Sequence, residues 1–480
     1  MKKIGIFICS FNGREYVIDC INSLYKQSAQ DFDIYVVDNA STDGTAEVLD
    51  KIFGNRITIL HNSENLGGAG GFDRGLQHGL QIGYEYLVML DNDIILDEYV
   101  IENLSEYLDR NSEVGIVGAK IYYMDEPEKI MDYGSMIDFD NFRVNNGYNS
   151  KRDDEDIPAI IECDFVPACA AMIRRSVLLE CGTMPIDCFI YYDDIEMCHR
   201  FSLKGHKVVA YSKAKVWHKG GGSSRKYQNT FSRYYFTRNK WNFFAKYIPE
   251  KKIEQLVDAI ISETFPVLYG CQYKGKRELY DTTKYIFEDF INNVRGKAQE
   301  GRINTLVSRE NPTIQKFKKK ECILIDFSSE GLSLDEIRKT NLFSLMKMLK
   351  SINPKIKCIT KMKNFTMDDK VSLTNYIFCE WDQEGIPHVI ADESTALQDV
   401  DIVLQYCKHA TLVQENILPT VYWDSHFNFI TDAADYNYYT NYKNELDNFK
   451  RKYEGKVIEA VRSVRENNSI GGLKVASIRD

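Results

Sequence analysis

The chain of 480 residues carries 60 Lys and Arg against 70 Asp and Glu, a formal net charge of −10 at pH 7. A general nucleic-acid-binding protein needs a basic surface to neutralise phosphates, so this balance argues against that class. Hydrophobic residues make up 44% of the chain, enough for packed cores, and the length predicts two or three domains.

The N-terminus and the hydropathy pattern predict no signal peptide and no membrane-spanning helix. The first residues, MKKIGIFICSFNG, lead directly into an apolar strand-like run. No run reaches about 18 consecutive apolar residues. Five of the 12 cysteines are loosely grouped without C-x-x-C spacing: Cys163, Cys169, Cys181, Cys188 and Cys198. We therefore expect reduced cysteines in a cytoplasmic protein, and no zinc site.

Strand-like and helix-like segments alternate over the first hundred residues. Four runs rich in Ile, Val, Tyr and Phe predict strands: KIGIFICSF, FDIYVVDNA, RITILHN and YLVMLDNDI. Helices are predicted over residues 15–25, 42–53 and 71–86. This alternation predicts a parallel sheet with helices on its faces, where ligands bind beyond the carboxyl ends of the strands. Six polar residues close these apolar runs: Ser10, Asn12, Asp38, Asn39, Asp91 and Asp93.

The glycine-rich stretch ENLGGAGGFDRG does not fit a dinucleotide-binding fingerprint. That fingerprint needs a third glycine where Asp73 stands, after Gly68 and Gly70. We interpret these glycines as letting the backbone approach a ligand or start a helix tightly. A flexible loop is the alternative.

Asp91 and Asp93 lie in the run LVMLDNDIIL, at the end of a predicted strand. Residues i and i+2 of an extended segment point to the same side, so both carboxylates can face one point. Two such charges repel, and burial increases the cost of each. A divalent cation such as Mg²⁺ or Mn²⁺ prefers oxygen ligands and neutralises both. The pattern favours a metal site, with a turn or helix cap as the alternative.

A second acidic cluster, Asp193, Asp194 and Glu196, follows in the stretch FIYYDDIEMCHRF. A carboxylate at a helix start faces the positive end of the helix dipole, which keeps it ionised and able to accept a proton. Glu196 stands four residues before Arg200, so an ion pair is its alternative role. His218 closes a strand-like run before KGGGSSRK, which makes it a candidate ligand, although an isolated histidine is more often structural.

Five segments occur in the order seen in inverting glycosyltransferases of family 2: VVDNASTDGT, NLGGAGGFDRG, LDNDI, YYDDIEMCHR and VWH. Over roughly residues 1–245 the chain resembles these enzymes, which have the GT-A fold, and Asp91-Asn92-Asp93 matches their D-x-D motif. The glycine stretch and the second acidic cluster look most like those of bacterial galactofuranosyltransferases. Rhamnosyltransferases of the same family share most of the pattern.

The resemblance implies a nucleotide-sugar site at the strand ends. Phe11 would contact the base, and Asp38 and Asn39 would hydrogen-bond the base or ribose. The residues implied for the rest of the donor site are Asn65, Gly68, Arg74 and Asn92. The implied ligands of Mn²⁺ or Mg²⁺ are Asp91, Asp93 and His218. Asp194 would be the base that takes the acceptor proton, with Asp193 and Glu196 orienting the acceptor.

The implied reaction is metal-dependent sugar transfer, first of all of galactofuranose from UDP-galactofuranose, to a cell-surface polysaccharide or lipid-linked glycan. A rhamnosyltransferase that uses dTDP-rhamnose is the alternative enzyme. A catalytically inactive GT-A binding module is the alternative from another class. Galactofuranosyltransferases of this kind place tryptophans before the acidic cluster, where this chain has FVPACAAMI, so we expect a different acceptor.

Residues 231–252, FSRYYFTRNKWNFFAKYIPEKK, interleave aromatic and basic side chains. Such a helix can lie on the inner membrane face, with its rings in the interface and its cations against anionic headgroups. The aromatic candidates are Tyr234, Tyr235, Trp241, Phe244 and Tyr247, and the basic ones are Arg233, Arg238, Lys240 and Lys246. A helix packed on the catalytic domain is the alternative. Single-stranded nucleic acid would also suit such residues but is disfavoured by the acidic chain.

We therefore expect a GT-A catalytic domain over residues 1–230 and a helical segment over residues 231–310. From Glu321 the pattern becomes α/β again, which predicts a C-terminal α/β domain over residues 321–480. Its expected strands are ECILIDFSS, KIKCITKM, VDIVLQYC and TVYWDS, and its expected helices are LDEIRKTNLFSLMKMLKSI and NELDNFKRKYEGKVIEAVRSVRENN. No nucleotide or metal motif occurs there, so acceptor binding, homo-oligomer contacts and partner docking remain open roles.

Overall fold

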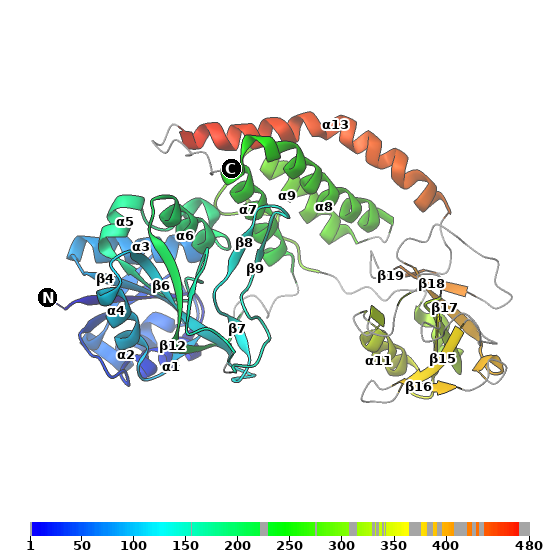
Figure 1. Ribbon diagram of the computed structural model, residues 1–480, viewed down its shortest axis with the longest axis horizontal. Helices are drawn as coiled ribbons and strands as arrows, with labels where there is room; N and C mark the ends of the chain where they lie inside the picture. The colour runs from blue at the N-terminus through cyan, green and yellow to red at the C-terminus, as the bar shows by residue number, and fades with distance from the viewer. Residues whose placement is uncertain are drawn as a thin grey trace. The chain divides into compact units, whose positions relative to one another are not determined.

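The structure of the protein is a computed structural model that describes most of the chain (Figure 1). The described residues are 2–154, 156–220, 229–273, 276–306, 314–328, 332, 336–337, 340, 342–363, 376–381, 387–390, 396–407, 420–424, 429–431 and 436–469. They form two compact units. The first unit comprises Met1–Thr264, Lys276–Leu306 and Lys452–Asp480, and the second comprises Phe265–Gly275 and Val307–Arg451.

The first unit is built on a ten-stranded sheet whose main path runs β10-β12-β6-β11-β4-β1-β2-β3. Its strands are β1 (Ile4–Ser10), β2 (Phe32–Asp38), β3 (Thr58–His61), β4 (Tyr86–Asp91), β5 (Ile94–Leu96), β6 (Val114–Tyr123), β7 (Ile130–Asp132), β10 (Ile160–Glu162), β11 (Ala170–Arg174) and β12 (Lys207–His218). Strands β4, β1, β2 and β3 are parallel, as the alternating pattern predicts. Strand β11 lies antiparallel between β4 and β6, so the sheet is mixed.

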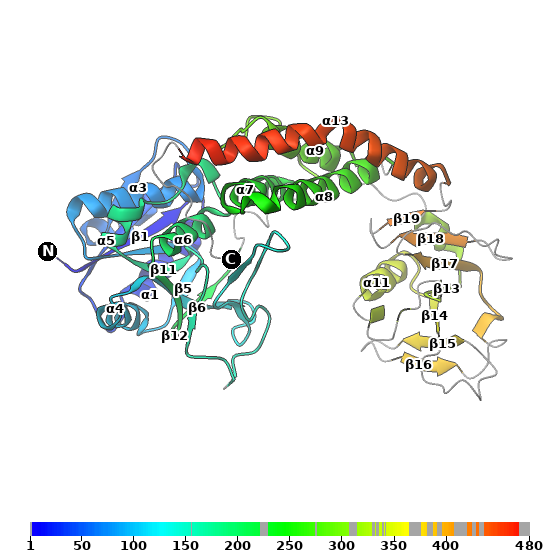
Figure 2. The same ribbon diagram turned by 45° about the horizontal axis from the view of Figure 1, so that its top comes forward.

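Helices cover both faces of this sheet. Those of the first half are α1 (Arg14–Leu24), α2 (Thr45–Phe53), α3 (Gly67–Ile82), α4 (Val100–Arg110), α5 (Arg175–Cys181) and α6 (Asp193–Leu203). Figure 2 shows α1 and α4 on one face and α3, α5 and α6 on the other. The remaining elements of this unit are η1 (Gly54–Arg56), η2 (Ile186–Cys188), η3 (Glu250–Lys252), the hairpin β8 (Met136–Asp138) and β9 (Arg143–Asn145), α7 (Phe231–Tyr247) and α9 (Arg277–Ile291).

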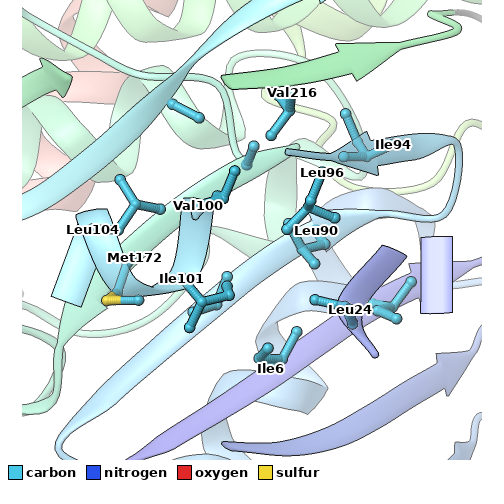
Figure 3. Packing of buried hydrophobic residues seen from close by; sticks show 14 of the residues in the cluster. Ile6, Leu24, Leu90, Ile94, Leu96, Val100, Ile101, Leu104, Met172 and Val216 are labelled. Carbon is cyan, nitrogen blue, oxygen red and sulfur yellow. The ribbon is translucent and has the colours of Figure 1, made fainter. Parts of the chain in front are cut away.

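Apolar residues of β1, β4 and β11 pack against α1 and α4 on one face of the sheet (Figure 3). The buried residues that make this contact include Ile6, Leu24, Leu90, Ile101, Leu104 and Met172. Burying one such side chain contributes roughly 1.5–3 kcal/mol. Because Leu90 is fixed in this core, the next residue, Asp91, emerges at a defined place on the edge of the sheet.

Helix α3 begins at Gly67 rather than at the predicted residue 71. The Asn65 Oδ1 accepts the Gly67 N–H at 2.8 Å, and Gly67 has a φ of 74°, which favours glycine. A Cβ added at Gly75 would lie 2.9 Å from the Phe7 Cβ, so α3 packs unusually close to β1. The glycine stretch therefore starts a helix tightly, as interpreted from the sequence, and the flexible-loop alternative is wrong.

The second unit contains a seven-stranded sheet in the order β16-β15-β14-β13-β17-β18-β19. Its strands are β13 (Cys322–Asp326), β14 (Lys357–Lys363), β15 (Tyr376–Trp381), β16 (Pro387–Ile390), β17 (Ile402–Cys407), β18 (Thr420–Asp424) and β19 (Phe429–Thr431), accompanied by η4 (Ile314–Lys319) and α11 (Leu342–Ile352). The four central strands, all predicted from their apolar runs, are parallel. The edge strands β15, β16 and β19 are antiparallel and were not predicted from the sequence. Two further helices contribute residues to both units: α8 (Ile253–Tyr273) and α13 (Tyr436–Ser469).

The prediction of an interfacial face on residues 231–252 is wrong. Its five aromatic side chains are each at most 5% exposed: Tyr234, Tyr235, Trp241, Phe244 and Tyr247. Helix α7 packs on α9, where the Trp241 ring meets Phe287 and Phe290. The rings thus have protein partners, as the alternative of a packed helix required. Among the described helices, none has both the length and the apolar character needed to cross a membrane.

Trp241→Ala tests this packing. The variant removes a buried ring, so we expect the free energy of unfolding to fall by about 3–5 kcal/mol. Binding to vesicles of anionic lipid should not differ from that of the wild type. Urea denaturation and vesicle co-sedimentation measure the two quantities. A variant that keeps its stability but loses vesicle binding would restore the interfacial interpretation.

Candidate active site

The polar residues that end β1, β2 and β4 lie at one edge of the sheet. Ser10 pairs with Asp38 across β1 and β2, and Cys9 pairs with Asp91 across β1 and β4. The sequence-based expectation that these residues share the carboxyl edge of a parallel sheet is therefore confirmed. This edge is where ligands bind in open α/β sheets.

His218 joins the two aspartates of the D-x-D motif. Strand β5, which follows Asp93, pairs antiparallel with β12, and this pairing sets His218 opposite Ile94. The His218 Nε2 lies 3.0 Å from the Asp93 Oδ1 and 3.5 Å from the Asp91 Oδ2. The three predicted metal ligands therefore meet, although His218 is far from the other two in sequence.

The electrostatics of this trio suit a divalent cation. Burial raises the pKa of Asp91 to about 6; His218 opposes the rise, whereas Asp93 and Asp194 add to it. Burial would lower the pKa of His218, but Cys169 and Asp93 raise it well above its ordinary value. A protonated imidazole thus offsets the carboxylate repulsion. A cation of higher charge can replace that proton, and two carboxylates with one imidazole are a fitting donor set for Mn²⁺ or Mg²⁺.

Cys169 is a neighbour of this trio that no sequence signal indicated. Its carbonyl oxygen accepts the Asp91 N–H at 3.1 Å, and its sulfur lies within 4.8 Å of ligand atoms of both Asp91 and His218. Burial raises the pKa of the thiol to about 11, so it stays protonated at neutral pH. A neutral thiol is a poor ligand for Mn²⁺ or Mg²⁺, so the candidate ligands for such a cation are the oxygen and nitrogen donors.

The second acidic cluster opens α6 beside the first. The Asp194 Oδ2 accepts the Ala168 N–H at 3.2 Å, and its Oδ1 accepts the Ile195 N–H at 2.8 Å. Burial raises the pKa of Asp194, and it raises the pKa of Asp193 to about 8, with Asp194 and Asp91 adding to the rise. The Ala168 N–H bonds Asp194 and the carbonyl of the next residue, Cys169, accepts the Asp91 N–H, so the two acidic clusters lie close together. The peptide N–H groups favour the charged form of Asp194, which is the form able to accept a proton, and its role as the base stays a prediction.

Asp132 is a further acid of this region that the sequence analysis did not single out. It is buried at the end of β7, and both carboxylate oxygens accept the Ser135 hydroxyl, at 2.8 and 2.7 Å. Burial raises its pKa to about 7, and Asp194 adds to the rise. No spacing pattern could have revealed it, because β7 joins the sheet only by pairing with β6.

Glu196 is held in an ion-pair network. The Arg200 Nη2 lies 3.0 Å from its Oε2, while the Lys246 Nζ and the Tyr247 hydroxyl donate to its Oε1 at 2.6 and 2.7 Å. Burial would raise the pKa of Glu196, but Arg200 and Lys246 lower it to about 2. The ion pair with Arg200 that the sequence left open is thus present within α6, and the bonds from Lys246 and Tyr247 link α6 to α7. The acceptor-orienting role implied by the resemblance stays a prediction.

Asn39 and Asn92 fix the backbone around the predicted donor site. Asn39 is 2% exposed; its Nδ2 donates to the Asn65 Oδ1 at 3.1 Å, and its Oδ1 accepts the Leu66 N–H at 3.0 Å. The Asn92 Nδ2 donates to the Ser10 hydroxyl at 3.2 Å. The amide of Asn39 thus holds the start of α3 in place, and its direct contact with a base or ribose stays a prediction.

The other predicted donor-site residues divide between two places. Phe11 is partly exposed just beyond β1, and Asp38 is buried with its Oδ1 accepting the Ser41 N–H at 3.1 Å. Gly68 faces the acidic cluster, since a Cβ there would lie 4.0 Å from the Asp193 Oδ2. Arg74 instead lines a hollow of about 390 Å³ with nine other residues: Glu64, Asn65, Leu66, Gly70, Asp73, Gln77, Ile186, Phe189 and Lys297. None of the aspartates of the two acidic clusters lines this hollow, so the structure does not bring Arg74 to them.

The residues before Asp193 adopt a strained backbone. Phe189, Tyr191 and Tyr192 have φ values of 65°, 64° and 66°, a region that non-glycine residues rarely occupy. Each such residue costs about 1–3 kcal/mol and persists only where its surroundings hold it. Such strain clusters at functional sites, and here it directly precedes the two acids. The loop KGGGSSRK that follows His218 falls largely on residues 221–228, outside the described part of the chain.

Residues 5–182 match the protein-family model described as glycosyl transferase family 2. Glycosyltransferase GlyG of Streptococcus pneumoniae serotype 4 is 29% identical over 130 residues, which are 26% of this chain and 42% of GlyG. Galactofuranosyltransferase GlfT2 of Mycolicibacterium smegmatis is 26% identical over 227 residues, 42% of this chain and 35% of GlfT2. The chain thus spans less than half the length of these relatives.

Solved structures are similar to this chain at lower identity. The crystal structure of S. aureus TarS 1–349 in complex with UDP-GlcNAc aligns with 65% of this chain and 98% of that one, at 14% identity and a TM-score of 0.37. That of GalNAc-T7 with UDP, GalNAc and Mn²⁺ aligns with 53% of this chain and 49% of that one, at 13% identity and a TM-score of 0.41. Because both TM-scores are low, the match of residues 5–182 to the family 2 model is the finding that bears on the family. That match and the mixed α/β sheet agree with the predicted GT-A class.

Asp93→Ala tests the cation site. The variant removes a carboxylate 3.0 Å from the His218 Nε2, so we expect Mn²⁺ affinity to fall by about 10²-fold or more. Mn²⁺ binding to the wild type should weaken as the pH falls, because the cation must displace the His218 proton and, below about 6, a proton on Asp91 as well. Isothermal titration calorimetry measures both effects. Asp125→Ala, an exposed acid paired with Lys219, is the control, and equal Mn²⁺ binding by both variants would contradict the site.

Asp132→Asn tests the burial of a carboxyl beside the site. In the folded protein Asp132 keeps its proton up to a pH of about 7, whereas in the unfolded chain it loses it near 3.8. Unfolding therefore releases a proton in this window. The stabilising contribution of the protonated Asp132 is fully present below pH 3.8 and is lost as the pH rises to about 7. Asp132→Asn should make the free energy of unfolding fall less steeply with pH.

Urea denaturation in EDTA at several pH values measures this slope. Asp31→Asn, which changes an exposed carboxyl, is the control. The free energy of unfolding of this variant should change with pH as steeply as that of the wild type. If Asp132→Asn and the wild type lose stability equally across this window, Asp132 is already ionised in the folded protein.

Proposed function

Taking residues 5–182 as a family 2 glycosyl transferase domain, we propose that this chain is a metal-dependent inverting glycosyltransferase. The observation that carries the proposal is the meeting of the D-x-D pair with His218, beside Asp193 and Asp194, at the carboxyl edge of a mostly parallel sheet. A binding module would have no need to hold so many acids together, since their mutual repulsion opposes folding.

The proposed reaction is a single displacement at the anomeric carbon of a nucleotide-sugar donor. Asp91, Asp93 and His218 hold Mn²⁺ or Mg²⁺, which when bound supplies positive charge for the departing nucleotide diphosphate. Asp194 takes the proton of the acceptor hydroxyl as its oxygen attacks the anomeric carbon. The bond from that carbon to the phosphate oxygen breaks, and its electron pair leaves with the diphosphate. One attack from the opposite face inverts the anomeric centre.

We propose galactofuranose from UDP-galactofuranose as the sugar moved, to a cell-surface polysaccharide or lipid-linked glycan. The similarity to the galactofuranosyltransferase GlfT2, which extends over 227 residues, supports this donor. A rhamnosyltransferase using dTDP-rhamnose is the second candidate. We expect an acceptor that differs from that of tryptophan-bearing galactofuranosyltransferases, since FVPACAAMI replaces that segment here.

A panel of nucleotide sugars tests the donor. Purified protein with Mn²⁺ and a cell-derived glycan acceptor should release nucleotide diphosphate fastest from UDP-galactofuranose. Turnover of dTDP-rhamnose with no turnover of UDP-galactofuranose would favour the rhamnosyltransferase. No turnover of any donor, with nucleotide-sugar binding retained, would favour an inactive binding module.

Asp194→Asn tests the proposed base. The amide keeps the size of the side chain but cannot accept a proton at neutral pH, so we expect kcat to fall by about 10²–10⁴-fold. Donor affinity should stay nearly unchanged, because this residue faces the acceptor. Steady-state kinetics and donor titration measure the two quantities.

Asp193→Asn is the matched comparison. We expect a smaller effect on kcat and a larger one on the acceptor KM, because this residue positions the acceptor. The reverse pattern, with Asp193 needed for kcat and Asp194 dispensable, would move the base by one residue. Loss of donor binding in Asp194→Asn would instead assign this acidic cluster to the nucleotide site.

A further inference from the structure

Helix α7 holds the strained segment that delivers the two acids. The amide nitrogen of Asn239 lies within hydrogen-bond distance of three carbonyl oxygens of that segment, which share its two N–H groups: those of Cys188 at 2.8 Å, Ile190 at 2.9 Å and Tyr191 at 2.9 Å. Asn239 is 3% exposed, so these bonds are buried. One side chain thus gathers three peptide groups that a relaxed backbone would point in different directions.

Arg238 supports the same contact from the adjacent position. Its Nε donates to the Asn239 Oδ1 at 3.1 Å, which orients the Asn239 amide with its nitrogen toward the segment. Its Nη2 donates to the Cys188 carbonyl at 3.3 Å and to the Gly296 carbonyl at 2.8 Å. The guanidinium is fully buried and lies over the rings of both Tyr234 and Tyr235, at 5.1 Å from each ring centre. The orientation of Asn239 is therefore fixed by its surroundings.

Aromatic and hydroxyl contacts fasten the remaining residues of the segment to α7. The Phe189 ring stacks on Tyr235 with centroids 4.9 Å apart. The Tyr191 hydroxyl lies 3.0 Å from the Ser232 hydroxyl. The Tyr192 ring meets Phe236 edge-on at 5.1 Å. Every residue from 188 to 192 thus has a contact with α7, and Asn239 is the residue that bonds most of them.

We propose that Asn239 is a positioning residue for sugar transfer, acting through Asp194 by clamping residues 188–192 in the conformation that aims the acid at the acceptor. This inference rests on the proposed function, because it takes Asp194 as the base. Helix α7, whose sequence predicts a membrane-facing helix, then holds residues 188–192 in place. The clamp also explains why the strained φ values before Asp193 persist.

Asn239→Ala and Asn242→Ala form a matched pair of variants. Both asparagines are buried on α7, at 3% and 4% exposure, but the described residues offer no hydrogen-bond partner to either amide atom of Asn242. We expect Asn239→Ala to lower kcat by roughly 10²-fold with donor affinity unchanged, since small displacements of a catalytic group have effects of that size. Asn242→Ala should keep the wild-type kcat. Asn239→Asp should be worse than Asn239→Ala, because its carboxylate faces three carbonyl oxygens.

A double-mutant cycle separates positioning from a general structural effect. If Asn239 acts through Asp194, adding Asn239→Ala to the Asp194→Asn variant should lower the remaining rate by less than about 2-fold. Independent effects would instead lower that rate by the full factor that Asn239→Ala causes in the wild type. A double variant whose kcat falls by the product of the two single effects would overturn the proposal. So would a wild-type kcat in Asn239→Ala.

Hydrogen–deuterium exchange gives a readout that does not need activity. Backbone amides of residues 188–196 should exchange faster in Asn239→Ala than in the wild type. In Asn242→Ala they should exchange at the wild-type rate. If the wild type turns over no donor, the proposed function fails while this measurement still shows whether the clamp exists. Unchanged exchange in Asn239→Ala would overturn the clamp itself.

Discussion

Repulsion among closely placed carboxylates is the constraint on which the rest of the first unit depends. Asp91 ends β4 and Asp93 follows it, while Asp193 and Asp194 open α6 beside them. Burial and the neighbouring acids raise the pKa of Asp91 and that of Asp193. In a low-dielectric interior such charges cost several kcal/mol unless they are compensated. The compensation comes from the His218 imidazole and from peptide N–H groups that bond Asp194. A divalent cation, as proposed for this site, would add further compensating charge.

The backbone on either side of the acids is held in place, which keeps the carboxylates together despite their repulsion. Leu90 lies in the packed core immediately before Asp91, and β5 and β12 pair immediately after Asp93. The close packing of α3 on β1 brings Gly68 beside Asp193. Helix α7 bonds the strained segment that ends at Tyr192. Helices and strands thus hold both acidic clusters in place. Catalytic groups need such fixed positions, because small displacements lower the rate of a reaction.

Several residues that the family resemblance placed against substrate have internal partners. The Glu196 carboxylate joins α6 to α7 through Lys246 and Tyr247, and the Asn39 amide bonds the start of α3. Buried polar groups need such partners, since each unsatisfied group costs about 1–3 kcal/mol. A motif residue can therefore be required for geometry without contacting a ligand. The sequence does not distinguish these cases, because both demand the same side chain.

The sequence by itself determined the parallel strands, the helices between them, the D-x-D pair and the second acidic cluster, because periodicity and strand-end position are local properties. It also indicated that His218 ends a strand. Only the tertiary structure decided that His218 meets Asp91 and Asp93, that Asp132 and Cys169 lie nearby, and that the aromatic rings of α7 are buried. These outcomes depend on antiparallel pairings and helix packing between segments distant in the chain. An aromatic and basic helix has the same pattern whether its rings face lipid or protein, so its environment was settled by what packs against it.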